Sequence, residues 1–319
     1  MEQKFNIRVI SGVNKKRILS WAGKFLMIAA LIFIAIRLRR YDVDFSILAS
    51  PLTIVGLLIN TLVLGLGVFL FAFNFVWLIR ALSGVSVERK SVISVYCATN
   101  LYKYLPGNVL QFIGRNRIAF DTGGISHTHV ALATILEIVF FCLAAVLLAS
   151  VFAFEYFVST IQMMYNSPLM FAVIGALMLV IIIAFVAFRE RVIVLLKRHK
   201  ELNFQFREMA ILLGNCSLRL IVMAGAYLLT LALFGQPLAI YLAFRVMGLF
   251  VLSWVIGFIV PGAPGGLGIR EAIMLMFMSD MIDEGILVSS AVVYRMICIA
   301  GDVFAYLIAI VYSKIGSGR

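Results

Sequence analysis

Apolar residues dominate this chain in long runs, and charged residues gather in the short stretches between them. A run of about 20 apolar residues is long enough to cross the hydrocarbon core of a bilayer as a helix. The runs that meet this requirement predict seven clear transmembrane spans. They are approximately 18–36, 52–79, 129–154, 168–188, 209–234, 238–260 and 286–312.

Two further apolar segments, about 91–114 and 261–279, are interrupted by proline and glycine. These residues break helices, and a broken helix leaves backbone groups without partners in hydrocarbon. Such segments persist at membrane depth only where they are buried in protein or line a wet cavity. We therefore expect two broken or re-entrant helices that pack against each other at membrane depth.

The two interrupted segments share a spacing, because Arg115 and Arg270 each follow a Pro-Gly pair eight residues after the glycine. A repeated interruption in corresponding positions of two halves points to the binding site of a transporter. The expected fold is all-α, a polytopic membrane helical bundle of about seven clear spans plus two broken or re-entrant helices. It forms a single integral membrane domain, 1–319, with pseudo-repeated halves of about 18–188 and 209–312.

The composition agrees with this fold, since the chain is 63% hydrophobic and only 13% charged. Its net charge of +12 is more typical of topology-setting loops than of nucleic-acid binding. Basic residues before position 18 and in the loop 189–207 place both in the cytoplasm, whereas 155–167 has no Lys or Arg. We expect a multi-pass inner-membrane protein with a cytoplasmic N-terminus. The side of the C-terminus stays open, because it depends on whether 261–279 crosses fully.

Several charged residues lie inside the predicted spans, where each costs about 2.5–3.5 kcal/mol to insert and usually faces a cavity or a partner. Glu137 is too deep to reach the interface, so it needs a donor, either in an ion pair or in a substrate site. Arg295 and Asp302 share one face of the last span and form either a packing pair or part of a site. Arg219 and Arg245 either reach the nearer interface or serve the function.

A Pro-Gly pair followed at this spacing by an arginine is suited to binding an anion. A broken helix exposes N–H groups at its new N-terminus, glycine lets a headgroup approach the backbone, and arginine offers a two-pronged donor to phosphate. We expect Arg115 and Arg270 to bind a lipid phosphate, with Glu137 and Glu271 orienting them or contacting a cationic headgroup. The predicted substrate-binding residues are Pro106, Gly107, Asn108, Arg115, Glu137, Pro261, Gly262, Gly265, Gly266, Gly268, Arg270, Glu271, Arg295 and Asp302.

Catalytic and metal chemistry find little support in the sequence. The motifs of zinc proteases, serine hydrolases and nucleotide-binding loops do not occur, and the only histidines are His127, His129 and His199. The four cysteines lie singly in apolar segments, which is typical of small buried hydrophobic residues. We expect no cofactor and no metal site, and we favour a protein that is not an enzyme.

A set of motifs runs through both halves: Lys103-Tyr104-Leu105-Pro106-Gly107-Asn108, Gly114-Arg115, Ala131-Leu132, Glu137 and Pro261-Gly262-Ala263-Pro264-Gly265-Gly266-Leu267-Gly268-Ile269-Arg270-Glu271. These motifs resemble the lysylphosphatidylglycerol synthase transmembrane-region family, a group of flippase-like membrane proteins of bacteria and archaea. The resemblance covers nearly the whole chain, and the last motif is its most specific element.

The resemblance implies a bundle that binds and translocates an anionic or modified lipid. The two-domain members carry a cytosolic domain that aminoacylates phosphatidylglycerol, and this sequence has no such domain, so we do not expect it to make the lipid. The leading hypothesis is a lipid transporter for an anionic phospholipid or a polyprenyl-phosphate-linked lipid. The alternative is a membrane-embedded enzyme or accessory subunit of polyprenol-linked glycan (surface polysaccharide) biosynthesis, and a lipid-binding scaffold is third. Expected partners are the membrane lipid and enzymes of glycan or lipid biosynthesis, without nucleic acid.

Overall fold

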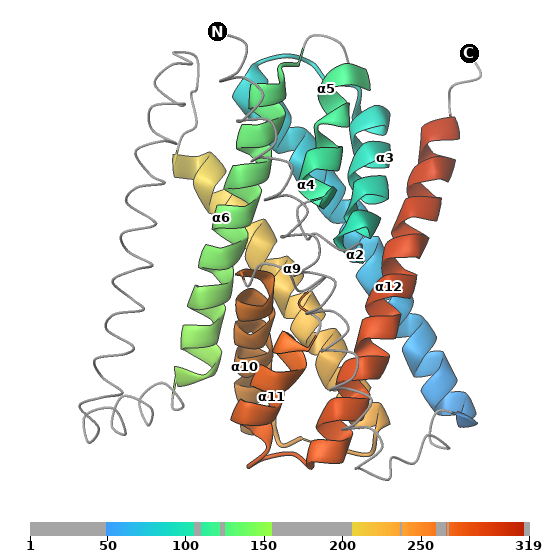
Figure 1. Ribbon diagram of the computed structural model, residues 1–319, viewed down its shortest axis with the longest axis vertical. Helices are drawn as coiled ribbons and strands as arrows, with labels where there is room; N and C mark the ends of the chain where they lie inside the picture. The colour runs from blue at the N-terminus through green and yellow to red at the C-terminus, as the bar shows by residue number, and fades with distance from the viewer. Residues whose placement is uncertain are drawn as a thin grey trace, which may run out of the picture.

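The computed structural model describes residues 49–104, 110–121, 125–154, 206–236, 238–259, 266 and 268–315. Within these ranges the chain forms helices joined by turns, and no strand occurs there (Figure 1). The predicted spans 18–36 and 168–188 and most of the basic loop 189–207 lie outside the described residues. So do the predicted site residues Pro106, Gly107, Asn108, Pro261, Gly262 and Gly265.

Five helices in the described part of the chain are long and apolar enough to cross a membrane. They are α2 (Pro51–Ser83), α6 (His127–Phe152), α9 (Phe206–Leu233), α10 (Ile240–Ile259) and α12 (Glu284–Lys314). Each coincides with one of the apolar runs that predicted a span. The expectation of a helical membrane bundle is therefore confirmed at this level.

Capping residues set where two of these helices begin. The side chain of Ser126 accepts a hydrogen bond from the backbone N–H of His129 at the start of α6. Asp283 accepts hydrogen bonds from the N–H groups of Gly285 and Ile286 at the start of α12. Because a cap satisfies the free N–H groups of the first turn, each helix starts slightly before its apolar run.

The two interrupted segments form short helices. The first contains α3 (Arg89–Asn100), the 3-10 turn η2 (Leu101–Tyr104) and α4 (Leu110–Arg115), and α5 (Arg117–Asp121) follows it. The second contains α11 (Ile269–Met278). At 1.5 Å per residue, the 12 residues of α3 extend about 18 Å, well short of a hydrocarbon core of about 30 Å.

Each short helix belongs to a helical hairpin. Helix α3 packs against α4, and α11 packs against α10. The first hairpin lies in the upper half of the molecule and the second in the lower half (Figure 1). Among the described helices, α3 packs on α2 and α12, whereas α11 packs on α10 and α12. The expectation that the two interrupted segments pack against each other stays a prediction, because 105–109 and 261–265 lie outside the described residues.

Small and amide-bearing residues hold the long helices together. A Cβ atom on Gly65 of α2 would lie 2.5 Å from the backbone oxygen of Gly301 on α12, so the two helices cross at backbone contact. The Nδ2 of Asn60 on α2 donates to the backbone oxygen of Ala226 (2.8 Å) and to the Oγ1 of Thr230 (3.1 Å) on α9. Close backbone approach and interhelical hydrogen bonds are the usual means of helix association in lipid.

Candidate functional site

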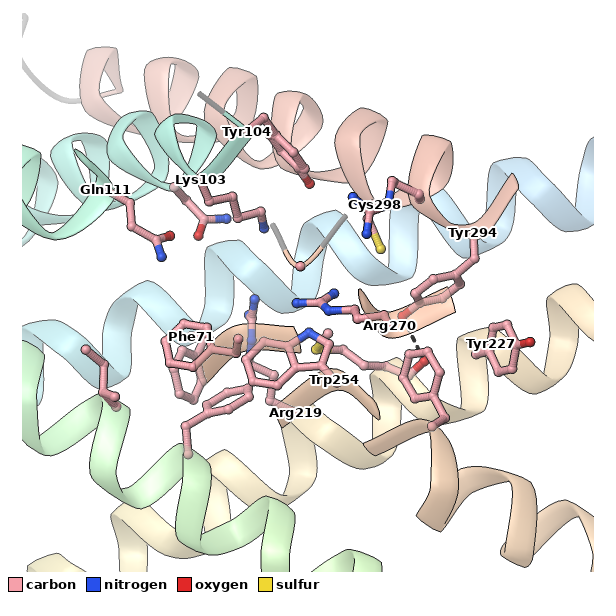
Figure 2. A pocket seen from close by; sticks show the side chains of 18 of the residues that line it. Phe71, Lys103, Tyr104, Gln111, Arg219, Tyr227, Trp254, Arg270, Tyr294 and Cys298 are labelled. Carbon is pink, nitrogen blue, oxygen red and sulfur yellow. Dashed lines mark hydrogen bonds between the residues drawn. The ribbon is translucent and has the colours of Figure 1, made fainter. Parts of the chain in front are cut away.

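A cavity of about 140 Å³ lies between the two hairpins and the long helices. All the long helices, together with α3, η2, α4 and α11, contribute side chains to its wall (Figure 2). Many of the predicted site residues converge on it. The ones that line the cavity are Arg115, Glu137, Gly266, Arg270, Glu271 and Arg295. Two of the others lie nearby, since Gly268 is the residue before α11 and Asp302 lines an adjoining groove.

Arg115 and Glu137 form a buried ion pair between α4 and α6. The Nη1 of Arg115 lies 2.9 Å from the Oε1 of Glu137, and the Arg115 side chain is only 3% exposed. The hydroxyl of Tyr96 donates to the same carboxylate oxygen at 3.0 Å, and its ring lies 4.2 Å from the guanidinium carbon. The donor that Glu137 required is therefore the motif arginine itself.

A second ion pair ties the other hairpin to α12, with the charges exchanged. The Oε1 of Glu271 on α11 lies 3.0 Å from the Nη2 of Arg295 on α12. In the first half the motif arginine pairs with a glutamate of the next long helix. In the second half the motif glutamate pairs with an arginine of the next long helix, and Arg270 is not its partner.

Asp302 is the centre of a third charged cluster, 2% exposed. Its Oδ1 accepts from the Nδ2 of Asn100 at 2.7 Å, and its Oδ2 lies 2.6 Å from the Nζ of Lys103. The hydroxyl of Tyr104 also donates to Oδ2. Arg295 and Asp302 thus have separate partners, and the interpretation of these two as one packing pair is wrong.

Arg270 lies in a slot made by two glycines and a tryptophan. Its guanidinium carbon is 4.9 Å from the centre of the Trp254 ring (Figure 2). A Cβ atom on Gly257 would lie 2.5 Å from its Cγ, and one on Gly266 would lie 2.7 Å from its Nε. Gly266 also has a φ of +73°, which favours glycine. Gly266 therefore makes room for the arginine side chain, a role that differs from the expected approach of a headgroup to the backbone.

Arg219 turns inward as well. Its Nη1 donates to the backbone oxygen of Gly67 at 3.1 Å, and its guanidinium lies 4.9 Å from the Phe71 ring centre. Of the two alternatives for this residue, a place at the cavity is therefore observed. Arg245 is different, because it pairs at 3.7 Å with Asp280 in the turn before α12.

The charges around the cavity do not balance. Each of the cations Lys103, Arg115 and Arg295 has its own carboxylate. Arg219 and Arg270 have no carboxylate within ion-pair distance among the described residues. Stacked aromatic pairs, Tyr227 with Phe250 and Trp254 with Phe258, supply much of the remaining wall. In such apolar surroundings an excess of positive charge attracts an anion more strongly than it would in water.

Several important residues of this site were absent from the predicted set. Lys103 and Tyr104 were known only as part of a motif, and Arg219 only as one of two alternatives. Trp254 and Gly257 gave no signal, because an aromatic residue or a glycine in an apolar run is common in transmembrane helices. Their role is visible only through their contacts with Arg270.

The described residues contain no cluster of His, Cys, Asp and Glu that could hold a metal ion. What the cavity offers is a fixed set of cationic donors, two carboxylates and aromatic walls inside a bundle of apolar helices. In comparisons with known proteins, no family model, curated protein or solved structure matches the chain.

Proposed function

We propose that this protein binds and translocates a lipid whose headgroup carries a phosphate, either an anionic phospholipid or a polyprenyl-phosphate-linked lipid. The observation that carries the proposal is the excess of positive charge at Arg219 and Arg270 within the cavity. A cation held in largely apolar surroundings without a carboxylate beside it is less stable than one in an ion pair. A ligand phosphate would offset this difference through charge-assisted hydrogen bonds to both side chains.

The arrangement of the hairpins supports transport over simple binding. The α3–α4 hairpin occupies one half of the molecule and the α10–α11 hairpin the other (Figure 1), and both contribute residues to the cavity. Transporters with inverted repeats hold their substrate between two discontinuous elements and expose it alternately to either side. We propose that the two hairpins are re-entrant from opposite membrane faces and that they act in this way. In this arrangement α10 ends within the membrane, although it is long enough to cross.

Membership of the lysylphosphatidylglycerol synthase transmembrane-region family is part of the same proposal. Its support here is that motif residues far apart in the sequence line one cavity. Lys103, Arg115 and Glu137 come from the first half, and Arg270 and Glu271 from the second. An inner-membrane location, and enzymes of lipid or surface-polysaccharide biosynthesis as partners, are further expectations of this proposal.

A membrane-embedded enzyme or accessory subunit of polyprenol-linked glycan biosynthesis remains the alternative. Glu137 and Glu271 each use one carboxylate oxygen in an ion pair, while the Oε2 of each is buried without a hydrogen-bond partner. Enzymes that cleave glycosidic bonds usually act through two carboxyl groups at one site. This is the observation that favours the alternative.

The test of binding is native mass spectrometry of the purified protein reconstituted with phosphatidylglycerol. Changing Arg270 or Arg219 to Gln removes charge-assisted bonds worth about 1.5–3 kcal/mol, so the occupancy of phosphatidylglycerol should fall by roughly 10- to 150-fold. Arg117→Gln is the control, because this exposed residue does not line the cavity. Unchanged occupancy in Arg270→Gln and Arg219→Gln variants of wild-type thermal stability would contradict the proposal.

The test of transport uses the same protein in liposomes that contain fluorescent phosphatidylglycerol. Transport predicts that more than half of the probe becomes accessible to a membrane-impermeant quencher, and that Arg270→Gln slows this exchange. An enzyme would instead convert a polyprenyl-phosphate sugar without moving the probe. Exchange no faster than in protein-free liposomes would reject translocation while leaving lipid binding intact.

A further inference from the structure

A lateral groove lies beside the cavity, between α2 and α9; it is the adjoining groove that Asp302 lines. It has a volume of about 450 Å³, compared with about 140 Å³ for the cavity. The two spaces share part of their walls and therefore adjoin each other. The shared residues are Phe71, Lys103, Arg219, Met223 and Cys298.

We infer that this lateral groove holds one acyl chain of the bound lipid, with the chain's ester carbonyl at Asn74. The inference rests on the proposed function, which places the phosphate at Arg219 and Arg270. It adds the path of the chain, the helices that contact it and the chemical link by which the chain is attached.

The polarity of the groove follows that of an amphiphile. Its rim is made of apolar side chains on the outer surface of the bundle, with Leu70 at 56% and Leu218 at 62% exposure. Its inner end carries the charged residues Lys103, Arg219 and Asp302. A hydrocarbon chain at the rim would therefore remain in contact with bilayer lipid while the phosphate reaches the cavity.

Asn74 supplies an independent observation. It lines the groove, is 8% exposed, and its Oδ1 accepts a hydrogen bond from the Nδ2 of Asn215 at 2.9 Å. Its own Nδ2 has no hydrogen-bond partner. A buried amide N–H without an acceptor costs about 1–3 kcal/mol. Asn74 is three residues from Phe71 on α2, and its partner Asn215 is four residues from Arg219 on α9. An ester carbonyl between the phosphate and the chain would supply the acceptor that the Nδ2 of Asn74 lacks.

Gly67 gives a way to fill the groove without disturbing the helices. It lines the groove, and a Cβ atom on it would have no atom within 4 Å. Gly214 on α9 is exposed and has the same free space, but it does not line the groove. Gly67→Leu and Gly214→Leu are therefore a matched pair, one blocking the groove and one leaving it open.

The first experiment uses phosphatidylglycerol with a photoreactive diazirine midway along one chain. In the wild-type protein and in Gly214→Leu, cross-links should map to α2 and α9. In Gly67→Leu this labelling should be at least about tenfold weaker, while the variant still binds chain-free glycerophosphoglycerol. Arg270→Gln should lose binding of both ligands. Labelling that persists in Gly67→Leu but fails in Arg270→Gln would reject the groove and leave the proposed function standing.

The second experiment compares ester-linked with ether-linked phosphatidylglycerol, which differ in the carbonyl that Asn74 would contact. One neutral hydrogen bond corresponds to about a 2- to 12-fold preference for the ester in the wild-type protein. Asn74→Leu should abolish this preference without abolishing binding. Equal occupancy of both lipids in the wild-type protein, or a preference that survives Asn74→Leu, would overturn the ester contact. Tighter retention of a polyprenyl phosphate by the wild-type protein would overturn it as well.

Discussion

Arg115 and Arg270 occupy matched positions after the two Pro-Gly pairs, but their surroundings give them different electrostatic roles. Arg115 is held by the carboxylate of Glu137 at 2.9 Å and is neutralised within the protein. Arg270 rests on Trp254 and has no carboxylate within ion-pair distance in the described ranges. Its charge is therefore available to a ligand, whereas that of Arg115 mainly serves to bury Glu137.

This difference predicts that replacing Arg115 mainly lowers the stability of the folded protein. Arg115→Met leaves the Glu137 carboxylate buried without its cation, and breaking a buried pair in this way costs about 3–5 kcal/mol. The double variant Arg115→Met/Glu137→Leu should recover most of that loss, because neither charge remains. Chemical denaturation of the purified variants measures the free energy of unfolding of the single and the double variant. An Arg115→Met variant as stable as the wild-type protein would show that the pair contributes nothing.

The slot around Arg270 gives a prediction in which every charge is kept. In Gly257→Ala the new Cβ atom would lie 2.5 Å from the Cγ of Arg270, so the side chain must move off Trp254. We expect the occupancy of phosphatidylglycerol to fall by about tenfold, which corresponds to about 1.4 kcal/mol. Gly214→Ala is the control, since that position has open space. Native mass spectrometry with equal lipid loading compares the phosphatidylglycerol occupancy of the two variants. Equal occupancy in both would contradict the prediction.

At the residue scale the sequence predicted many of the charges that share the site but not how they pair. The cost of inserting a charge into lipid requires Glu137, Arg270 and Arg295 to face inward, and all three line one cavity. Pairing depends on the rotation and height of each helix, which apolar periodicity does not specify. For that reason the separate partners of Arg295 and Asp302 could not be foreseen.

At the element scale, hydropathy identified the long helices and the proline-glycine motifs identified the interruptions. Both signals are local, since one reflects the length of an apolar run and the other the breaking of a helix. The packing of α11 against α10 is a tertiary contact, and no local sequence feature of 261–279 indicates it. The same holds for the α2–α12 crossing, which depends on glycines in two distant helices.

That crossing gives a prediction with a matched control two residues away. Gly65→Ala would place a Cβ atom 2.5 Å from the backbone oxygen of Gly301, so α2 and α12 must separate. Overpacking of this kind costs about 1–3 kcal/mol of unfolding free energy. Gly67→Ala has open space and should leave stability nearly unchanged. Equal denaturation midpoints for both variants would mean that the helices adjust without cost.

At the scale of the whole molecule, charge differs between the two ends of the bundle. Lys90, Arg117 and Lys314 lie toward one end, and the Nζ of Lys90 donates to the backbone oxygen of Ile315. The turn at the other end, between α11 and α12, carries Asp280 and Asp283. Basic loops stay in the cytoplasm. We therefore propose that the basic end is cytoplasmic, which would place the end of α12 inside and resolve the side that the sequence left open.

The last prediction tests this orientation with two single cysteines in a background where the four native cysteines are changed to serine. Ser86, between α2 and α3, is exposed at the basic end, and Ser279, after α11, is exposed at the acidic end. A membrane-impermeant maleimide added to spheroplasts should label Ser279→Cys and leave Ser86→Cys unlabelled. Permeabilising the membrane should then make Ser86→Cys react, because the site is exposed once the reagent can reach it. The reverse pattern would show that the basic end faces outward. Equal labelling of both sites before permeabilisation would show that the ends of α2 and α11 do not lie on opposite sides of a membrane, against the proposed arrangement of the two hairpins.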